Sequence, residues 1–401
     1  MKETRILQAA AHALVVWLAA CSSEPLANAV GRSAVDDVLV APNGSQTTVE
    51  AFWTYDLTRG RWSTSASAFS LAGGRALSFW SLTGNTADGS AVGAGSAAVD
   101  TTISALIAGG RARAALATAD AALYTGQDPK WVRLTMTTPR IEHDMAEIAG
   151  QRVLIVGGYG TTANVPLTSA EIFTLSTRSF AATGSLHIAR ADHALATLPD
   201  GRVLVIGGLT PSGAGTNTVD VASTEIFNPA NGVFSDGPLM TVPRFNHSAI
   251  TLNDGRVLVL GGNDKRSAEV YTPTSNRFTA IGDMFAIHGR GHVALELPNG
   301  RILVTGGDMA VNQPTSIVEQ FDPVANVFTT VGNMTTARML HFAVLLPDGK
   351  VLIGGGRGTS GAELASAEIY DPATNTAVRI ADMPGTTADQ AAALIRVPGR
   401  R

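Results

Sequence analysis

The sequence predicts an all-β protein built from similar small sheets placed side by side. Two observations lead to this class. Glycine fills 42 of the 401 positions and only 15% of residues are charged, a composition that suits many short strands joined by tight turns. One pattern of apolar runs and turn residues also recurs along the chain from about residue 136. Apolar residues make up 45% of the chain, which is enough for a sizeable core and excludes a disordered protein.

A Gly-Gly pair marks every copy of the pattern. Each pair ends a run of mostly apolar residues such as Val257–Leu260, and tight-turn residues such as Asn253-Asp254-Gly255 come before this run. A Glu-Ile-Tyr or similar segment and then an aromatic residue follow the pair, so each copy is predicted to hold four antiparallel strands. The pairs lie 45 to 54 residues apart, at Gly157-Gly158, Gly207-Gly208, Gly261-Gly262, Gly306-Gly307 and Gly355-Gly356.

The apolar run before each Gly-Gly pair determines how the copies should pack. A strand such as Val257–Leu260 is apolar on both faces, so both faces need cover. Four-stranded sheets that are covered on both faces can stand around a common axis, as the blades of a β-propeller do. The stretch after each Gly-Gly pair varies in length, which predicts a loop there.

The two ends of the chain are predicted to complete one shared blade. Residues 391–397 would be its first strand, and residues 38–62 would supply the other three. This arrangement closes the ring and removes its free edges. Seven blades result, namely the shared one, one at residues 65–134 and five regular ones. Six blades with an irregular N-terminal segment are the alternative.

The blade at residues 65–134 is the least regular. Residues 66–82, with Gly73-Gly74-Arg75 as their turn, are predicted to form its first two strands, and Trp131 to lie in its last. Residues 84–117 are rich in Gly, Ala and Ser and are predicted to be an inserted loop. The propeller domain as a whole is predicted to span residues 35–401.

The repeated unit resembles a known family. The unit has Gly-Gly after four apolar residues, then Tyr or Phe, and then a spaced aromatic. This pattern is similar to the kelch repeat of β-propellers in the galactose oxidase and kelch-like superfamily. The resemblance is strong over residues 136–380 and partial before them. Trp62 and Trp131 keep the tryptophan that the family has in its last strand. Phenylalanine replaces this tryptophan in most copies, at Phe180, Phe234, Phe278 and Phe328.

The N-terminus predicts a lipoprotein of the cell envelope. Lys2 and Arg5 precede an apolar stretch that is too short to span a bilayer, and the segment ends Leu-Ala-Ala-Cys21-Ser22, which resembles the lipobox of bacterial lipoproteins. The resemblance implies a signal peptide at residues 1–20, lipidation of Cys21, and a tether at residues 21–34. Ser22 favours outer-membrane sorting, with the domain on the periplasmic or surface face. An ordinary signal peptide with a chance cysteine is the alternative. Cys21 is the sole cysteine, so no intramolecular disulfide can form.

Histidine and glutamate recur at fixed places in the copies. A ring of five imidazoles invites a zinc or copper interpretation. A residue that every blade repeats is better explained by a structural need of every blade, so we predict no metal site. The glutamates are predicted to brace loops. The residues are His143, His193, His247, His292 and His341, and Glu171, Glu225, Glu269, Glu319 and Glu368.

An arginine recurs where the chain crosses from one blade to the next. The kelch resemblance implies that these crossings share a face with the loops after Gly-Gly, and that this face binds partners. A ring of guanidinium groups there would hold carboxylates or acidic peptides. Pairing with a glutamate of a neighbouring blade is the alternative. In the fourth regular copy His288 stands where the arginine is expected. The candidates are Arg140, Arg190, Arg244, Arg290 and Arg338.

Loops that depart from the repeat are the other candidate partner sites. Besides residues 84–117, they contain Lys265, Arg266, Asp308 and Arg357. Ordinary solvated loops are the alternative, because loops vary at little cost.

The predicted function is a binding scaffold for a protein, peptide or glycan, without a cofactor. Galactose-oxidase-like copper enzymes need a cysteine cross-linked to a tyrosine, whereas Cys21 lies outside the propeller, and no hydrolase or phosphate-loop motif occurs. A carbohydrate-active enzyme (hydrolase, epimerase or oxidase-like) with a site at the propeller axis is the alternative, because paired acids need no linear motif. Purely structural scaffolding is a third hypothesis. The net charge of −4 argues against a nucleic-acid partner.

Overall fold

The structure is a computed structural model of the whole chain. It describes residues 36–41, 48–57, 59–72, 78–82, 104–110, 117–124, 131–162, 164–212, 217–263, 265–386 and 391–396. These residues form β-strands joined by turns and loops, with no helix among them. The predicted signal peptide, Cys21 and the predicted tether lie outside the described residues.

Seven four-stranded antiparallel sheets make up this part of the chain, and we call them blades I to VII in ring order. Blade I contains β30 (Ala391–Arg396), β1 (Asp36–Ala41), β2 (Thr48–Asp56) and β3 (Arg61–Ala72). Blade II contains β4 (Ser78–Leu82), β5 (Ser104–Ala108), β6 (Asp120–Tyr124) and β7 (Trp131–Thr135). Blade III contains β8 (Asp144–Ile148), β9 (Arg152–Val156), β10 (Ala170–Thr174) and β11 (Ser179–Ala182).

The remaining blades follow in chain order. Blade IV contains β12 (Ala194–Thr197), β13 (Val203–Ile206), β16 (Thr224–Asn228) and β17 (Val233–Asp236). A two-stranded hairpin, β14 (Leu209–Pro211) and β15 (Thr218–Asp220), extends from blade IV. Blade V contains β18 (Ser248–Thr251), β19 (Val257–Leu260), β20 (Ala268–Thr272) and β21 (Arg277–Ile281). Blade VI contains β22 (His292–Glu296), β23 (Ile302–Gly306), β24 (Ile317–Asp322) and β25 (Val327–Asn333). Blade VII contains β26 (Phe342–Leu345), β27 (Val351–Gly354), β28 (Ala367–Asp371) and β29 (Thr376–Arg379).

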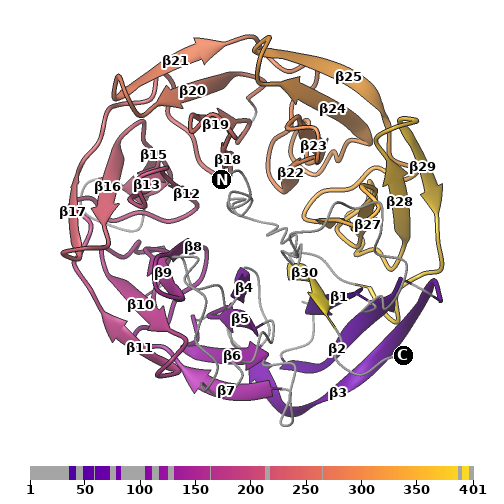
Figure 1. Cartoon of the computed structure of the whole chain (residues 1–401), viewed down its shortest axis with the longest axis horizontal. Helices are drawn as coiled ribbons and strands as arrows, with labels where there is room; N and C mark the ends of the chain where they lie inside the picture. The colour runs from indigo at the N-terminus through magenta and orange to yellow at the C-terminus, as the bar shows by residue number, and fades with distance from the viewer. Residues whose placement is uncertain are drawn as a thin grey trace, which may run out of the picture.

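The blades stand around a central axis (Figure 1). The innermost strand of each blade contacts the innermost strand of the next, in the cyclic order β4, β8, β12, β18, β22, β26, β30 and back to β4. The predicted all-β propeller is therefore confirmed. Seven sheets in the described residues are consistent with the seven-blade prediction rather than with six.

Blade I joins strands from both ends of the chain, as the sequence predicts. β30 is its innermost strand and pairs with β1 in antiparallel register, from Asp36 opposite Arg396 to Ala41 opposite Ala391. The outer strand is also linked to blade VII, because the indole Nε1 of Trp62 donates a hydrogen bond to the carbonyl of Ala381 at 3.0 Å.

Blade II corrects two sequence predictions. Residues 66–72 belong to β3 of blade I, so they are not the first strand of blade II. The second strand of blade II is β5, which lies inside the segment 84–117 that we predicted to be an inserted loop. Leu106 and Ile107 of β5 are buried, and Gly109-Gly110 after them have positive φ angles of 72° and 121°. The Gly-Gly pair of this blade is therefore Gly109-Gly110, and the predicted turn Gly73-Gly74-Arg75 lies outside the described residues.

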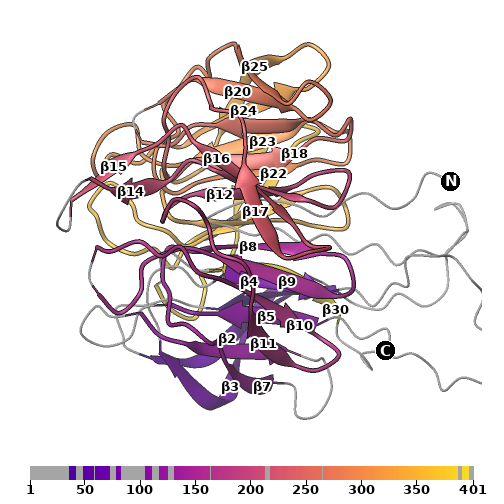
Figure 2. The ribbon, with the colours of Figure 1, turned by 90° about the vertical axis from the view of Figure 1, so that its left-hand side faces the viewer.

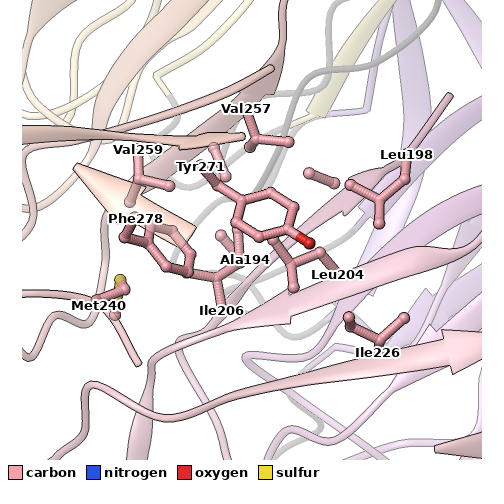
Figure 3. Packing of buried hydrophobic residues seen from close by; sticks show 12 residues of the cluster. Ala194, Leu198, Leu204, Ile206, Ile226, Met240, Val257, Val259, Tyr271 and Phe278 are labelled. Carbon is pink, nitrogen blue, oxygen red and sulfur yellow. The ribbon is translucent and has the colours of Figure 1, made fainter. Parts of the chain in front are cut away.

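The core lies between neighbouring blades rather than at the axis. Figure 3 shows one such cluster, in which side chains of blade IV such as Leu204 pack against Val259 and Tyr271 of blade V. Leu204 and Val259 have no exposed surface, and burying each contributes roughly 2 kcal/mol. The Phe residues that replace tryptophan also pack here, since the rings of Tyr271 and Phe278 lie 5.1 Å apart.

Candidate functional site

One end of the propeller carries the loops that follow the Gly-Gly pairs. In an antiparallel blade the loop from the second to the third strand and the crossing to the next blade leave at the same end. We call this end the Gly-Gly face, because each variable loop begins at a Gly-Gly pair. The hairpin of β14 and β15 projects from it, on the left side of Figure 2.

The crossing arginines lie beneath this face instead of on it. Four of them are fully buried, with no exposed surface on the side chain: Arg140, Arg190, Arg244 and Arg338. Each forms an ion pair of 2.9 to 3.1 Å with the glutamate of the blade that the chain is entering. The prediction that these four arginines form an accessible partner-binding ring is therefore wrong, because no solvent-borne partner can reach the guanidinium groups. The alternative of pairing with a glutamate holds, except that each glutamate belongs to the arginine's own copy of the repeat and not to a neighbouring blade.

Arg244 illustrates the bonding of these arginines. Its Nη1 donates to the carbonyls of Gly261 at 3.0 Å and Ser267 at 2.8 Å, and its Nη2 donates to a carboxylate oxygen of Glu269 at 3.1 Å. The backbone carbonyl of Arg244 accepts from the N–H of Gly208 in blade IV at 2.8 Å. Burial lowers the pKa of the guanidinium and the charge of Glu269 opposes this effect. One residue thus links two blades.

The glutamates also brace the crossings, as predicted. Glu269 accepts the N–H of Thr241, and Glu368 accepts the N–H of Thr335. Glu171 accepts both the N–H and the hydroxyl of Thr137, at 2.7 and 2.8 Å. The carboxylates of Glu171, Glu269 and Glu368 are therefore occupied by an arginine and by backbone donors.

Each of the five repeated histidines is buried and packs between two adjacent Gly-Gly turns. A Cβ added to Gly157 of blade III would lie 2.8 Å from Cε1 of His193, and a Cβ on Gly208 would lie 2.8 Å from Cβ of the same histidine. Glycine is therefore needed on both sides of the imidazole. Burial lowers the pKa of His143 to about 3 and that of His193 and His341 well below the usual value, so these rings are neutral. Among the described residues no group of three or more His, Cys, Asp or Glu side chains could hold a metal ion.

The residue before each of these histidines lies at the inner end of a crossing, next to the axis. All five have positive φ angles, between 50° and 72°, in the left-handed region: Glu142, Asp192, Asn246, Gly291 and Leu340. Backbone hydrogen bonds join neighbours of this set, from the N–H of Asp192 to the carbonyl of Glu142 at 3.0 Å and from Asn246 to Asp192 at 2.9 Å. These residues form the axial rim of the Gly-Gly face, and their side chains differ from blade to blade.

Tyr159 provides the most chemically distinctive group at the axial rim. It follows the Gly-Gly pair of blade III and pairs with Ile141 through two backbone hydrogen bonds of 2.7 and 2.9 Å. Its hydroxyl lies near the side chains of Asp192 and Thr218, which both influence its pKa. Burial, and then the negative charges of Asp192 and Glu142, raise the pKa of Tyr159, so the phenol keeps its proton. The repeat pattern alone does not identify Tyr159, although the position before each histidine differs between copies and distinguishes Glu142 and Asp192.

The loop candidates have local partners. Lys265 lies 4.0 Å from Asp220 of the hairpin, and Arg266 lies 3.8 Å from Asp283. Arg357 lies 3.6 Å from Glu363 of the same loop. The Arg266–Asp283 pair is exposed and contributes little to stability, whereas the other two pairs are partly exposed.

Arg290 and Asp308 meet at the start of the variable loop of blade VI. The N–H of Asp308 donates to the carbonyl of Arg290 at 3.2 Å, and the N–H of Gly289 donates to the carbonyl of Asp308 at 2.9 Å. Arg290 is half-buried, unlike the four buried crossing arginines, because His288 occupies the buried position in its place.

The Gly-Gly face also carries most of the exposed apolar side chains. Eleven large apolar side chains are exposed in the described residues, and seven of them belong to the loops and crossings of this face. The seven are Val165, Ile188, Val219, Leu239, Phe285, Met309 and Val311. Phe285 and Val311 are the most exposed of these, at 71% and 80%.

Comparison with known proteins agrees with this architecture. The family model for the Kelch motif matches residues 289–335, which span blade VI. A fungal alcohol oxidase of the AA5 family, solved in complex with copper, superposes with a TM-score of 0.57 at 16% identity over 71% of this chain. The chain spans only 63% of the length of that oxidase. The structure of YjhT superposes with a TM-score of 0.54 at 15% identity, covering 69% of this chain and 94% of YjhT.

No curated protein matches the sequence. Identities this low establish the fold alone, and the fold is a kelch-type β-propeller. In the part of the chain that the structure describes, no helix has the length and apolarity of a membrane span.

Proposed function

We propose that this protein is a binding module whose Gly-Gly face captures a protein or peptide. The observation that carries the proposal is the concentration of exposed apolar side chains on that one face, led by Phe285 and Val311. Large exposed apolar side chains cost little when they are scattered, but their collection on one face marks an interaction surface. The buried repeats beneath them hold the loops in fixed positions.

Apolar contacts favour a protein or peptide ligand over a glycan. The centres of protein interfaces are rich in aromatic and large apolar side chains and poor in charge, with polar groups at the rim. Lys265, Arg266 and Arg357 lie in loops of the same face and would supply such a rim.

We also propose that the propeller is held at the cell envelope through lipidated Cys21. The support is the sequence of the N-terminus, where the sole cysteine follows an apolar stretch and Leu-Ala-Ala. Several acyl chains on one cysteine anchor a protein durably. A tether of residues 21–34 would then let the Gly-Gly face reach a partner.

A paired-variant capture experiment tests the binding function. The soluble fragment from residue 22 onward, immobilised, is incubated with an envelope extract, and captured proteins are quantified for the wild type and two double variants. Phe285→Ser with Val311→Ser changes the Gly-Gly face, whereas Val324→Ser with Val378→Ser changes exposed valines elsewhere. We expect the first pair to lose a specific captured protein and the second to retain it. Equal capture by both variants would contradict the proposal.

A second candidate is a carbohydrate-active enzyme with its site at the axial rim. Tyr159, whose pKa is raised by burial and by the nearby charges of Asp192 and Glu142, favours it, because glycoside chemistry uses carboxylates beside a proton donor. Turnover of model glycosides that disappears in Asp192→Asn and Tyr159→Phe variants, together with metal quantification of the purified protein, would separate this function from simple binding.

A further inference from the structure

The crossing into blade VI contains a titratable residue where the described crossings into blades III, IV, V and VII contain arginine. His288 has no exposed surface and takes the place of the buried guanidinium. Its Nδ1 lies 2.7 Å from the carbonyl oxygen of Gly306, and its Nε2 lies 3.1 Å from a carboxylate oxygen of Glu319. These partners match those of Arg244, which bonds the carbonyl of Gly261 and the carboxylate of Glu269.

Both ring nitrogens of His288 face acceptors. A carbonyl oxygen can only accept, so Nδ1 carries a proton. Glu319 accepts the N–H groups of Phe285 at 2.9 Å and Ala286 at 2.8 Å, and the hydrogen bond from His288 helps to lower its pKa, although burial opposes this. The carboxylate is therefore ionised and Nε2 must also donate. Full satisfaction of this site requires the imidazolium form.

The other groups around His288 do not replace this pair. The ring of His292 lies 6.4 Å away, and His341 from the crossing into blade VII is close enough for the two histidines to lower its pKa further. Asp308 borders the neighbouring Gly289, and Arg290 follows it in the chain. Only Glu319 forms a direct charged contact with His288 among the described residues.

We propose that the His288–Glu319 pair is a pH-sensitive latch, closed when the imidazole carries both protons and released when it loses one. After that loss, a lone pair on Nε2 faces a carboxylate, and the buried negative charge lacks its partner. The four arginine crossings cannot respond in this way, because guanidinium stays protonated. The stabilisation is therefore present while both ring nitrogens donate and is lost when one proton leaves.

The His288–Glu319 pair fixes an exposed, apolar part of the Gly-Gly face. Glu319 fixes the backbone at Phe285 and Ala286, and Phe285 is 71% exposed. Release at alkaline pH would free residues 282–291, including Phe285. This inference concerns the local structure and stands without the proposed binding function.

Thermal unfolding between pH 5.5 and 9 provides the first test. We expect the melting temperature of the wild type to fall on the alkaline side by roughly two degrees or more beyond that of His288→Arg. His187 is the necessary control, since it lies 2.8 Å from Asp236 at the surface, and the hydrogen bond to this carboxylate raises its pKa. His187→Gln should follow the wild type. A His288→Arg profile that runs parallel to the wild type, or a flat profile for His187→Gln, would overturn the proposal.

Amide exchange in the wild type tests the same latch without a variant. Peptides that contain Phe285 and Ala286 are compared with peptides that contain Thr241 and Val242, whose N–H groups bond Glu269 at an arginine crossing. After correction for intrinsic rates, exchange from pH 6 to 8.5 should rise more in the first peptides, by up to about tenfold per pH unit for release of one proton. An equal rise in both sets would show that the crossing into blade VI is not a latch.

Discussion

Arg244 and Glu269 form an ion pair of 3.1 Å in which neither side chain has any exposed surface. The same contact occurs at three further crossings, so it belongs to the scaffold and not to a variable site. Because the carbonyl of Arg244 also accepts the N–H of Gly208, the pair lies within the junction between blades IV and V.

Replacing Arg244 with alanine should destabilise the propeller strongly. The variant leaves the buried carboxylate of Glu269 and two carbonyls without their donor, which costs about 3–5 kcal/mol. Denaturant unfolding followed by circular dichroism measures the loss. Arg277→Ala changes an exposed arginine of β21 and should stay within about 0.5 kcal/mol of the wild type. Similar losses of unfolding free energy in both variants would mean that the buried ion pair contributes no more to stability than the exposed arginine does.

Replacing Gly157 with alanine should cost more than replacing Gly201. Both residues have positive φ angles, 59° and 84°, so both substitutions carry backbone strain of about 1–2 kcal/mol. At Gly157 the new Cβ would lie 2.4 Å from the carbonyl oxygen of Arg190 and 2.8 Å from His193, whereas nothing lies within 4 Å at Gly201. Overpacking should add about 1–3 kcal/mol at Gly157 alone. Chemical denaturation gives the difference in unfolding free energy between the two variants. A difference near zero would argue against tight packing of His193 against Gly157.

Acidification should destabilise the protein through its neutral buried histidines. Burial lowers the pKa of His143 to about 3, below the value near 6.5 of the unfolded chain. The unfolded state therefore binds the proton first, and stability is lost as the pH falls from about 6.5 towards 3, by up to about 1.4 kcal/mol per pH unit for each such histidine. Denaturant midpoints across this range measure the slope. A His143→Asn variant that folds should show a shallower slope, and an unchanged slope would exclude His143 as a contributor.

Cys21→Ser should release the protein from membranes. The predicted lipid is attached to the sulfur, so serine removes the attachment point while leaving residues 36–396 unchanged. Detergent phase partitioning of cell extracts measures the effect, with the wild type expected in the detergent phase and the variant in the aqueous phase. Ser22→Asp keeps the cysteine and serves as the control, which should still partition with detergent. Aqueous partitioning of the wild type would rule out the lipoprotein prediction.

The repeat itself could be predicted from the sequence because each copy repeats the same physical requirements. Gly-Gly pairs, tight turns and strands that are apolar on both faces specify four-stranded blades that cover one another. Blade II was misassigned because Gly73-Gly74 precedes an apolar stretch and resembles a turn. The Gly-Gly pair of this blade, Gly109-Gly110, lies after a Gly-, Ala- and Ser-rich segment whose composition masks β5.

The candidate site was harder to predict because it depends on which side chains reach solvent. A crossing arginine such as Arg190 has the same sequence signature whether it faces a ligand or a buried glutamate. Tyr159, Asp192 and Thr218 lie far apart in the chain and come together only when blades III and IV are in place. Only the exposed apolar residues distinguish the Gly-Gly face, and their exposure follows from the complete ring.

The shared blade has a consequence for how the protein is made. β1 precedes every other described strand in the chain and its partner β30 follows them all, so the inner edge of β1 stays unpaired until β30 has been made. An open strand edge is a template for pairing with other chains. The interval before β30 emerges is therefore the period in which a nascent chain is most exposed to aggregation, and chaperone demand should be greatest then.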